Sequence, residues 1–316
     1  MTGPAPAPAP DALPDSRRFL GRFTPPSLLP FVQLARWDRP IGWQLLLAPC
    51  LWGEALASDA ALRAPSLPRI ALYAIGAIAM RGAGSTWNDV ADRKLDAGVE
   101  RTRGRPLPSG RIGVRAALAW CACQALVGFA VLLTFNRFAV LVGVASLGVV
   151  AIYPFAKRFT SWPQLVLGFA FAWGALLSWA AALGALHWPA LWLYLAAILW
   201  TIGYDTIYAL QDLRDDAIMG IRSTARLFGD DVRLAVGAIY LLTVACAEVA
   251  LWLVRVGPLA QLGLVAFAAH LVWQVRRLDD ATPAVALRLF RSNRDAGLLF
   301  FLGLAADALA VARGFY

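Results

Sequence analysis

The sequence predicts an all-α fold, a multi-spanning membrane bundle of about nine transmembrane helices. Of its 316 residues, 59% are hydrophobic and only 16% are charged, whereas soluble globular domains are roughly half apolar and about a quarter charged. Apolar stretches of about twenty residues recur along nearly the whole chain, and each is long enough to cross the ~30 Å hydrocarbon core of a bilayer as a helix. The stretches are continuous and lack the alternation typical of a transmembrane β-barrel, so we expect no strands.

The apolar stretches follow one another with polar connections between them. Tryptophans such as Trp43, Trp87 and Trp188 lie near their ends, where tryptophan commonly anchors a helix at the membrane interface. We therefore expect transmembrane helices, in order, at residues 40–57, 69–87, 115–134, 138–155, 164–184, 190–211, 232–254, 260–276 and 295–313.

Arginine and lysine are distributed unevenly between the connections of this bundle. With the N-terminus in the cytoplasm, most basic residues fall in inner loops, and the outer loops hold only Arg63, Arg69, Arg137, Arg255 and Arg313. This bias obeys the positive-inside rule, and it accounts for the net charge of +9 without a nucleic-acid partner. The sequence therefore predicts a multi-pass protein of the lipid bilayer. Its arginine-rich, lysine-poor usage indicates a GC-rich bacterial source, for which the expected location is the inner membrane.

The first thirty residues differ in composition from the rest. Residues 4–10 alternate proline and alanine, a pattern typical of polyproline II that cannot build a core. This stretch lacks the charged segment followed by an apolar segment that is typical of a cleaved signal, so we do not expect one. We expect residues 1–30 to be a disordered cytoplasmic tail and residues 31–316 to be a single transmembrane domain.

Two acidic clusters end the second and sixth predicted helices, on the same, cytoplasmic side. The first, NDVADRKLD, covers residues 88–96, and the second, DLRDD, covers residues 212–216. Acidic side chains are costly near hydrocarbon, so a membrane protein that keeps this many usually needs them. Helical spacing places two sets of polar side chains each on one face: Asn88, Asp92 and Asp96; and Asp212 with Asp216.

The two clusters resemble each other beyond their carboxylates. Arg101-Thr102 follows the first cluster, Arg222-Ser223 follows the second, and the clusters lie four predicted helices apart. This similarity indicates two pseudo-repeated helical halves that each present one cluster to a shared cavity.

The clusters contain aspartate and asparagine but neither histidine nor cysteine. Such oxygen ligands favour Mg²⁺ over zinc or copper, and Mg²⁺ is often held by one or two carboxylates together with phosphate oxygens. Two such sets suggest cations that hold a diphosphate and make it a better leaving group. The basic residues that could bind the remaining phosphate charge are Arg36, Lys157 and Arg158. The aromatic residues that could stabilise the cation left by a departing diphosphate are Tyr153, Phe155, Trp173, Tyr204 and Tyr208.

A cation-coupled membrane transporter is the alternative without covalent chemistry, since transporters also use acidic residues in membrane helices. Transporters place those residues near the bilayer midplane, often on helices broken by glycine or proline. Here the acids end unbroken apolar runs beside arginine-rich loops. That placement favours a polyanion site at the membrane surface.

Several stretches together resemble the UbiA-type intramembrane prenyltransferases. Residues 88–110, from the first cluster through RTRGRPLPSG, resemble the first family signature. Residues 204–216 (YDTIYALQDLRDD) resemble the second, which continues into GIRSTA at 220–225. Residues 36–42 (RWDRPIG) resemble the entry to the first helix, and residues 153–160 (YPFAKRFT) resemble a loop of the 4-hydroxybenzoate branch.

The resemblance implies a nine-helix bundle around a central cavity open to the bilayer. It implies Mg²⁺-dependent transfer of a polyprenyl group from polyprenyl diphosphate to 4-hydroxybenzoate, at the ring carbon ortho to the hydroxyl, in ubiquinone synthesis. Other branches with the same motifs use homogentisate, a dihydroxynaphthoate, a haem vinyl group or a chlorophyll precursor. The acceptor is therefore assigned by resemblance alone, and the sequence specifies neither the prenyl chain length nor a protein partner.

The resemblance also assigns roles by position. Lys157 and Arg158 would bind the diphosphate, and Arg36 would pair with either the diphosphate or the acceptor carboxylate. Asp205 is a candidate proton acceptor or phenol partner. The magnesium–diphosphate sets would be Asn88, Asp92 and Asp96, with Asp89 in support, and Asp212 and Asp216, with Asp215 in support.

Overall fold

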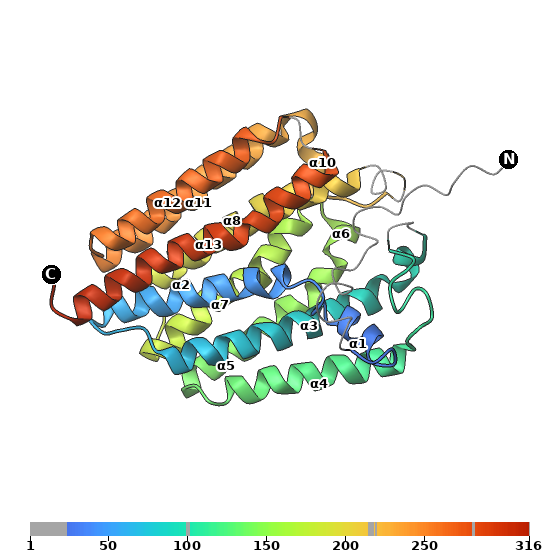
Figure 1. Cartoon of the computed structure of the whole chain (residues 1–316), viewed down its shortest axis with the longest axis horizontal. Coiled ribbons are helices and arrows are strands. Elements are labelled where there is room, and N and C mark those ends of the chain that lie inside the picture. The colour runs from blue at the N-terminus through green and yellow to red at the C-terminus, as the bar shows by residue number, and fades with distance from the viewer. Residues whose placement is uncertain (1–23, 99–101, 214–217, 219, 280–281, 316) are drawn as a thin grey trace. The chain divides into compact units, whose positions relative to one another are not determined.

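All the regular structure in the described part of the chain is helical (Figure 1). The computed structural model describes residues 24–98, 102–213, 218, 220–279 and 282–315, and no strand occurs in them. The predicted all-α fold is therefore confirmed. Most of the predicted tail, residues 1–23, lies outside the described residues, as do Asp215 and Asp216 of the second acidic cluster.

Each apolar stretch predicted from the sequence lies within, or largely within, a long helix. These helices are α2 (Ile41–Ala60), α3 (Leu67–Gly98), α4 (Val114–Leu132), α5 (Arg137–Ile152), α7 (Pro163–Leu183), α8 (Trp188–Ala209), α11 (Val232–Val254), α12 (Pro258–Arg276) and α13 (Pro283–Ala312). The shorter helices are α1 (Leu29–Leu34), η3 (Tyr153–Phe155), α6 (Ala156–Phe159), η4 (Leu210–Asp212), α10 (Thr224–Phe228) and η5 (Gly229–Asp231).

Seven helical stretches of the described residues are long and apolar enough to cross a membrane. They include every long helix except α2 and α3, whose apolar sequences are interrupted by Glu54 and Arg81. These helices fit an integral, multi-pass membrane protein, and the count of nine spans stays a prediction.

Two helix boundaries differ from the predicted ones by more than ten residues. Helix α13 begins at Pro283, twelve residues before the predicted start at 295, and α3 continues to Gly98, beyond the predicted end at 87. Apolarity places a boundary at the first charged residues, but a helix continues wherever its backbone hydrogen bonds do. At α13 the start is marked instead by a cap, in which Thr282 Oγ1 accepts a hydrogen bond from the Val285 N–H at 3.3 Å.

The chain divides into two compact units. Unit 1 comprises Met1–Gly42 and Ile78–Val127, and it contains α1, the part of α3 with the first acidic cluster, and most of α4. Unit 2 comprises Trp43–Ala77 and Gly128–Tyr316, and it contains nearly all of α2, the start of α3 and the helices from α5 to α13.

A small hydrophobic core lies beside the acidic cluster of unit 1. The ring of Trp120 in α4 packs edge-on against Phe31 of α1, with centroids 5.6 Å apart, and its Nε1 donates to the Phe31 carbonyl oxygen at 3.2 Å. These contacts fix α1 and the loop that follows α3 against α4. The buried members of this core are Leu34, Leu107, Ile112 and Ala117.

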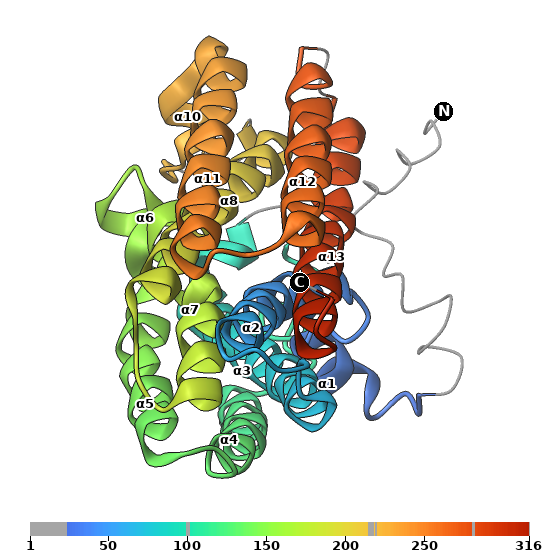
Figure 2. The same cartoon turned by 90° about the vertical axis from the view of Figure 1, so that its left-hand side faces the viewer.

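Helix α8 lies in the interior of unit 2, against α7, α11 and α13, and α12 runs beside α13 (Figures 1 and 2). The ring centroid of Trp52 lies 4.8 Å from that of Trp200 and 5.1 Å from that of Phe300. Both indoles find buried acceptors, since Trp52 Nε1 donates to the Gly297 carbonyl at 2.8 Å and Trp200 Nε1 to Asn293 Oδ1 at 2.9 Å. The aromatic core is thus both packed and hydrogen-bonded.

Glu54 of α2 is the centre of a buried ion-pair cluster in unit 2. Its carboxylate accepts from the Ser66 N–H at 3.0 Å, from Arg69 Nε and Nη2 at 2.8 and 2.7 Å, and from the Tyr73 hydroxyl at 3.0 Å. Removing one partner of a buried ion pair typically costs about 3–5 kcal/mol, because the other charge stays buried. We expect Glu54→Ala to lower the thermal unfolding midpoint of the purified protein by several degrees.

Arg294→Gln is the matched control for this prediction. Arg294 pairs with Asp295 through side chains that are 55% and 50% exposed, and such surface pairs contribute about 1 kcal/mol or less. Equal midpoints for the two variants would contradict the stabilising role of the Glu54 cluster.

Candidate active site

The first acidic cluster lies on the last turns of α3, in unit 1. The helix runs to Gly98, so Asn88, Asp92 and Asp96 occupy successive turns of one face. Asp92 and Asp96 are only 1% and 7% exposed, and Asn88 is half-buried. Two buried carboxylates one turn apart provide hard oxygen atoms for a cation.

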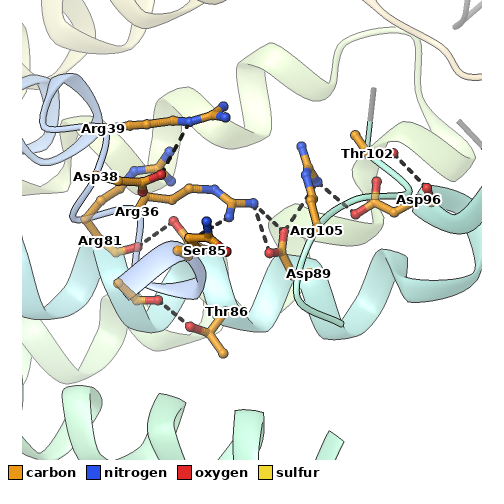
Figure 3. A network of polar contacts seen from close by, with 12 residues as sticks. Arg36, Asp38, Arg39, Arg81, Ser85, Thr86, Asp89, Asp96, Thr102 and Arg105 are labelled. Carbon is orange, nitrogen blue, oxygen red and sulfur yellow. Dashed lines mark hydrogen bonds and ion pairs between the residues drawn. The ribbon is translucent and has the colours of Figure 1, made fainter. Parts of the chain in front are cut away.

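Arg36, just after α1, pairs with Asp89 of this cluster (Figure 3). Its Nη2 donates to both Asp89 carboxylate oxygens, at 2.7 and 2.9 Å, and its Nη1 donates to the Gln33 carbonyl at 2.7 Å. The φ angle of Arg36 is +57°, a left-handed conformation that residues other than glycine rarely adopt. The ion pair with a fully buried carboxylate helps to hold this strained backbone in place.

Arg105, which the sequence analysis did not single out, bridges two carboxylates of the cluster (Figure 3). Its Nη1 donates to Asp96 Oδ2 at 2.8 Å and to Asp89 Oδ1 at 3.4 Å. Thr102 Oγ1 donates to the Asp96 carbonyl oxygen at 2.8 Å, so the loop after α3 folds back onto the cluster. The signal that could have found Arg105 is the arginine-rich stretch RTRGRP that follows the acidic helix end.

The backbone at Gly42 passes very close to Arg81 of α3. A side-chain carbon at Gly42 would overlap the Arg81 guanidinium, so a larger residue there would displace the Arg81 side chain. Ser85 Oγ donates to the Arg81 carbonyl oxygen at 2.8 Å (Figure 3). The RWDRPIG stretch therefore meets α3 at two points, through Arg36 and through Gly42.

The second acidic cluster begins where α8 ends, in unit 2. Asp205 and Tyr208 lie in the last turns of α8 and Asp212 lies in η4, and all three are half-buried. Asp215 and Asp216 lie outside the described residues, so their roles stay predictions from the sequence.

Aromatic rings of α8 and α13 contact one another beside this second cluster. The ring centroid of Tyr208 lies 4.6 Å from that of Phe290, and Tyr204 lies 5.9 Å from Phe290 and 5.1 Å from Trp200. Aromatic faces stabilise nearby cations. The ring of Tyr208, a predicted cation-stabilising residue, is thus packed against Phe290.

The segment after the second cluster is docked onto α7 and α8. The hydroxyl oxygens of Thr224 and Thr206 lie 2.6 Å apart in a hydrogen bond, and the Thr224 N–H donates to Gln164 Oε1 at 3.0 Å. Arg222 Nη1 donates to the Phe159 carbonyl at 3.2 Å. Thr224, directly after the pair Arg222-Ser223, is therefore held against α7 and α8, while Arg222 itself contacts the end of α6.

Tyr153, Lys157 and Arg158 lie in η3 and α6, the short helices that follow α5. Tyr153 and Lys157 are half-buried, and Arg158 is exposed. The Arg158 guanidinium lies 5.0 Å from the centroid of the Phe155 ring, a cation–π distance. Two cationic side chains thus lie next to each other at the end of α5.

The donor atoms of the first cluster fit Mg²⁺. Among the described residues, no three histidine, cysteine, aspartate or glutamate side chains are grouped so that they alone could hold a metal ion. Mg²⁺ seldom uses such a cage, because it keeps several waters and takes one or two carboxylates together with phosphate oxygens. Asp92 and Asp96 provide that number of carboxylates.

The sequence of this chain is similar to those of known membrane enzymes. The model of the UbiA prenyltransferase family matches residues 46–304. A mitochondrial 4-hydroxybenzoate polyprenyltransferase of Drosophila melanogaster is 44% identical over 283 residues, 89% of this chain and 71% of the relative. A 4-hydroxybenzoate octaprenyltransferase of Pseudomonas aeruginosa (strain UCBPP-PA14) is 42% identical over 277 residues, 88% of this chain and 93% of the relative.

Solved structures share the fold. A UbiA homologue from Aeropyrum pernix K1 superposes with a TM-score of 0.70 at 24% identity, over 84% of this chain and 97% of that one. A UbiA homologue from Archaeoglobus fulgidus, bound to DMAPP and Mg²⁺, superposes with a TM-score of 0.66 at 18% identity, over 90% of this chain and 99% of that one. The family match covers far more than half of the chain, and the chain belongs to the UbiA prenyltransferase family.

Proposed function

We propose that this protein transfers a polyprenyl group from polyprenyl diphosphate to 4-hydroxybenzoate, at the ring carbon ortho to the hydroxyl, as a step of ubiquinone biosynthesis. The observation that carries the proposal is the identity of 44% and 42%, over nearly nine-tenths of the chain, with relatives named for this acceptor. The buried carboxylates of α3 and the arginines beside them support a diphosphate-containing donor.

Mg²⁺ is the cofactor that we assign to the acidic clusters. When bound, it would neutralise the negative charge that develops on the diphosphate as the carbon–oxygen bond breaks. A UbiA homologue solved with DMAPP and Mg²⁺ supports metal dependence in the family. We assign the metal to Asn88, Asp92 and Asp96 of the first cluster and to Asp212 and Asp216 of the second, with Asp215 in support.

The chain's own residues then act on the diphosphate and on the prenyl cation. Lys157 and Arg158 bind phosphate oxygens, which favours departure of the diphosphate with the electron pair of the carbon–oxygen bond. The allylic cation left behind lies against the rings of Tyr153 and Tyr208. An apolar membrane interior keeps water away from this cation.

The acceptor completes the reaction with a balanced exchange of bonds. The phenol oxygen raises the electron density at the ortho carbon, whose π electrons form the new carbon–carbon bond to the cation. The ring then loses the proton of that carbon, and Asp205 on α8 is the residue that we assign to accept it. The products are a prenylated hydroxybenzoate, diphosphate and one proton.

Arg158→Ala tests the diphosphate role of α6. Arg158 is exposed and its guanidinium lies over the Phe155 ring, so its removal should leave the fold intact. We expect the KM for polyprenyl diphosphate to rise by about tenfold, the effect of losing one good charged contact, while kcat changes less. Steady-state kinetics with the donor varied provides the measurement, and an unchanged KM and kcat would remove Arg158 from the site.

We assign the protein to a bacterial inner membrane, and the positive-inside pattern supports an orientation with the N-terminus and both acidic clusters facing the cytoplasm. An impermeant thiol reagent tests this orientation in intact cells. A cysteine introduced at Arg103, an exposed loop residue after the first cluster, should react only after the cells are permeabilised. Reaction in intact cells would reverse the topology.

An acceptor panel tests the proposed function. The purified protein, reconstituted in lipid, is supplied with a long-chain polyprenyl diphosphate and with 4-hydroxybenzoate, homogentisate or a dihydroxynaphthoate, each with Mg²⁺ or with EDTA. Mass spectrometry should detect a prenylated product with 4-hydroxybenzoate and Mg²⁺ only. A product with another acceptor alone would keep the chemistry and replace the acceptor, and a product in EDTA would contradict metal dependence.

A further inference from the structure

Asp89 of the first cluster is bound by guanidinium groups on both of its carboxylate oxygens. Arg36 Nη2 donates to Oδ1 and Oδ2 at 2.7 and 2.9 Å, and Arg105 Nη1 lies 3.4 Å from Oδ1. The Asp89 side chain is completely buried, while the Arg36 and Arg105 side chains are 16% and 24% exposed. A metal ligand in this position would have to give up these charge-assisted bonds to two partly buried guanidinium groups.

Arg105 connects this anchor to a carboxylate that we assign to the metal. The same Nη1 atom that contacts Asp89 donates to Asp96 Oδ2 at 2.8 Å. The guanidinium thus neutralises the charge of Asp96, as a cation bound there would. Mg²⁺ at Asp96 would weaken the attraction between Asp96 and Arg105, and the guanidinium, which also contacts Asp89, would then be able to turn toward a phosphate oxygen.

We propose that Asp89 is a positioning residue and not a metal ligand, and that it holds Arg105 as an exchangeable cation that leaves Asp96 for the donor diphosphate when Mg²⁺ binds. This inference rests on the proposed function, because it takes Asp96 as a metal ligand and a diphosphate as part of the substrate. It adds Arg105 to the diphosphate-binding residues. It also explains why Arg36 keeps a left-handed backbone, since Asp89 fixes its side chain.

Several contacts hold the backbone of the loop that carries Arg105 in place beside Asp89 and Asp96. Thr102 Oγ1 donates to the Asp96 carbonyl at 2.8 Å, and Leu107 and Ile112 are buried in the core of unit 1. Ser109 Oγ donates to the Arg105 carbonyl oxygen at 2.6 Å. A loop fixed at several points lets a side chain exchange partners without moving the backbone.

Two probes separate the roles: Mn²⁺ alone, as a stand-in for Mg²⁺ detected by electron paramagnetic resonance, and inorganic pyrophosphate in the presence of Mg²⁺. Arg105→Gln should tighten Mn²⁺ binding by at least about threefold, because a competing cation leaves Asp96, and weaken pyrophosphate binding by about tenfold. A merely structural role would weaken both. Arg105→Lys keeps the charge and should lie between the wild type and Arg105→Gln in both measurements.

Asp89→Asn tests the anchor. It should weaken pyrophosphate binding and speed hydrogen exchange of residues 102–112, while the Mn²⁺ dissociation constant stays within about threefold of the wild type. Asp92→Asn is the metal-ligand comparison and should weaken Mn²⁺ binding strongly. Arg111→Gln is the matched loop control, because its guanidinium contacts Gln33 and Gly104 and not a cluster carboxylate; it should leave both affinities unchanged.

The outcomes distinguish this inference from the proposed function. Mn²⁺ binding lost in Asp89→Asn as in Asp92→Asn, or Mn²⁺ and pyrophosphate binding both weakened in Arg105→Gln, would overturn the positioning role. The expected variant effects without a prenylated hydroxybenzoate from the wild type would support the positioning role and overturn the acceptor assignment. A folded wild type that binds neither probe would overturn both.

Discussion

Asp92→Ala and Asp96→Ala are each expected to lower kcat by at least about 10²-fold, with the protein still folded and inserted, because each removes a group that stabilises charge in the transition state. Both side chains are almost completely buried and lie one turn apart on the same helix. The loss should appear in kcat as well as in KM, since a departing diphosphate has more charge to stabilise than a bound one.

The control for these variants is Asp231→Ala. Asp231 is an exposed aspartate of η5 outside both clusters, so its removal should leave turnover unchanged. Turnover is followed as product mass per mole of folded protein at fixed free Mg²⁺. Near-normal kcat in both Asp92→Ala and Asp96→Ala would show that the first cluster does not hold the metal.

Asp212→Ala and Asp216→Ala are expected to have an effect of the same size, because the second cluster repeats the spacing of the first. If two metal-binding sets act on one diphosphate, neither replaces the other. Raising Mg²⁺ to millimolar concentrations should recover part of the activity of a variant with a weakened site, and none where a ligand is essential to the transition state.

Two patterns of activity among these variants would contradict the role of the second cluster. Activity near that of the wild type in Asp212→Ala and Asp216→Ala, together with inactive Asp92→Ala, would mean that only the first cluster binds the metal. Near-normal activity in any two of the four variants would overturn the two-cluster mechanism.

Much of the fold could be predicted because a bilayer constrains it strongly. Continuous apolar stretches of membrane-spanning length have few alternatives to helices, and the predicted stretches do lie in helices. The boundaries were less predictable, since apolarity ends where charges begin while the helix does not. The first turns of α13 carry Arg288, Arg291 and Arg294 and are helical nonetheless.

The candidate site was predictable where it depends on spacing along one helix. The alignment of Asn88, Asp92 and Asp96 follows from helical periodicity alone. The pairing of Arg36 with Asp89 does not, because it joins residues 53 apart in the chain and requires a left-handed backbone at Arg36. Such contacts depend on tertiary structure, which periodicity cannot specify.

The contacts of Arg105 also could not be predicted from the sequence. It lies in a loop among several arginines, and nothing in its spacing separates it from Arg103 or Arg111. Only the path of the loop brings its guanidinium to Asp96 and Asp89, while Arg111 contacts Gln33 instead. Selecting one arginine of a basic loop therefore requires the structure.

The most direct test of the central claim is a measurement of both products of one reaction. The purified protein in liposomes is given a long-chain polyprenyl diphosphate, 4-hydroxybenzoate and Mg²⁺, and released diphosphate and prenylated product are quantified from the same sample. We predict equal amounts of the two, with nuclear magnetic resonance placing the prenyl group on the carbon ortho to the hydroxyl. Diphosphate released without that product, or no donor consumed by folded protein, would contradict the account, and the second result would favour a cation-coupled transporter.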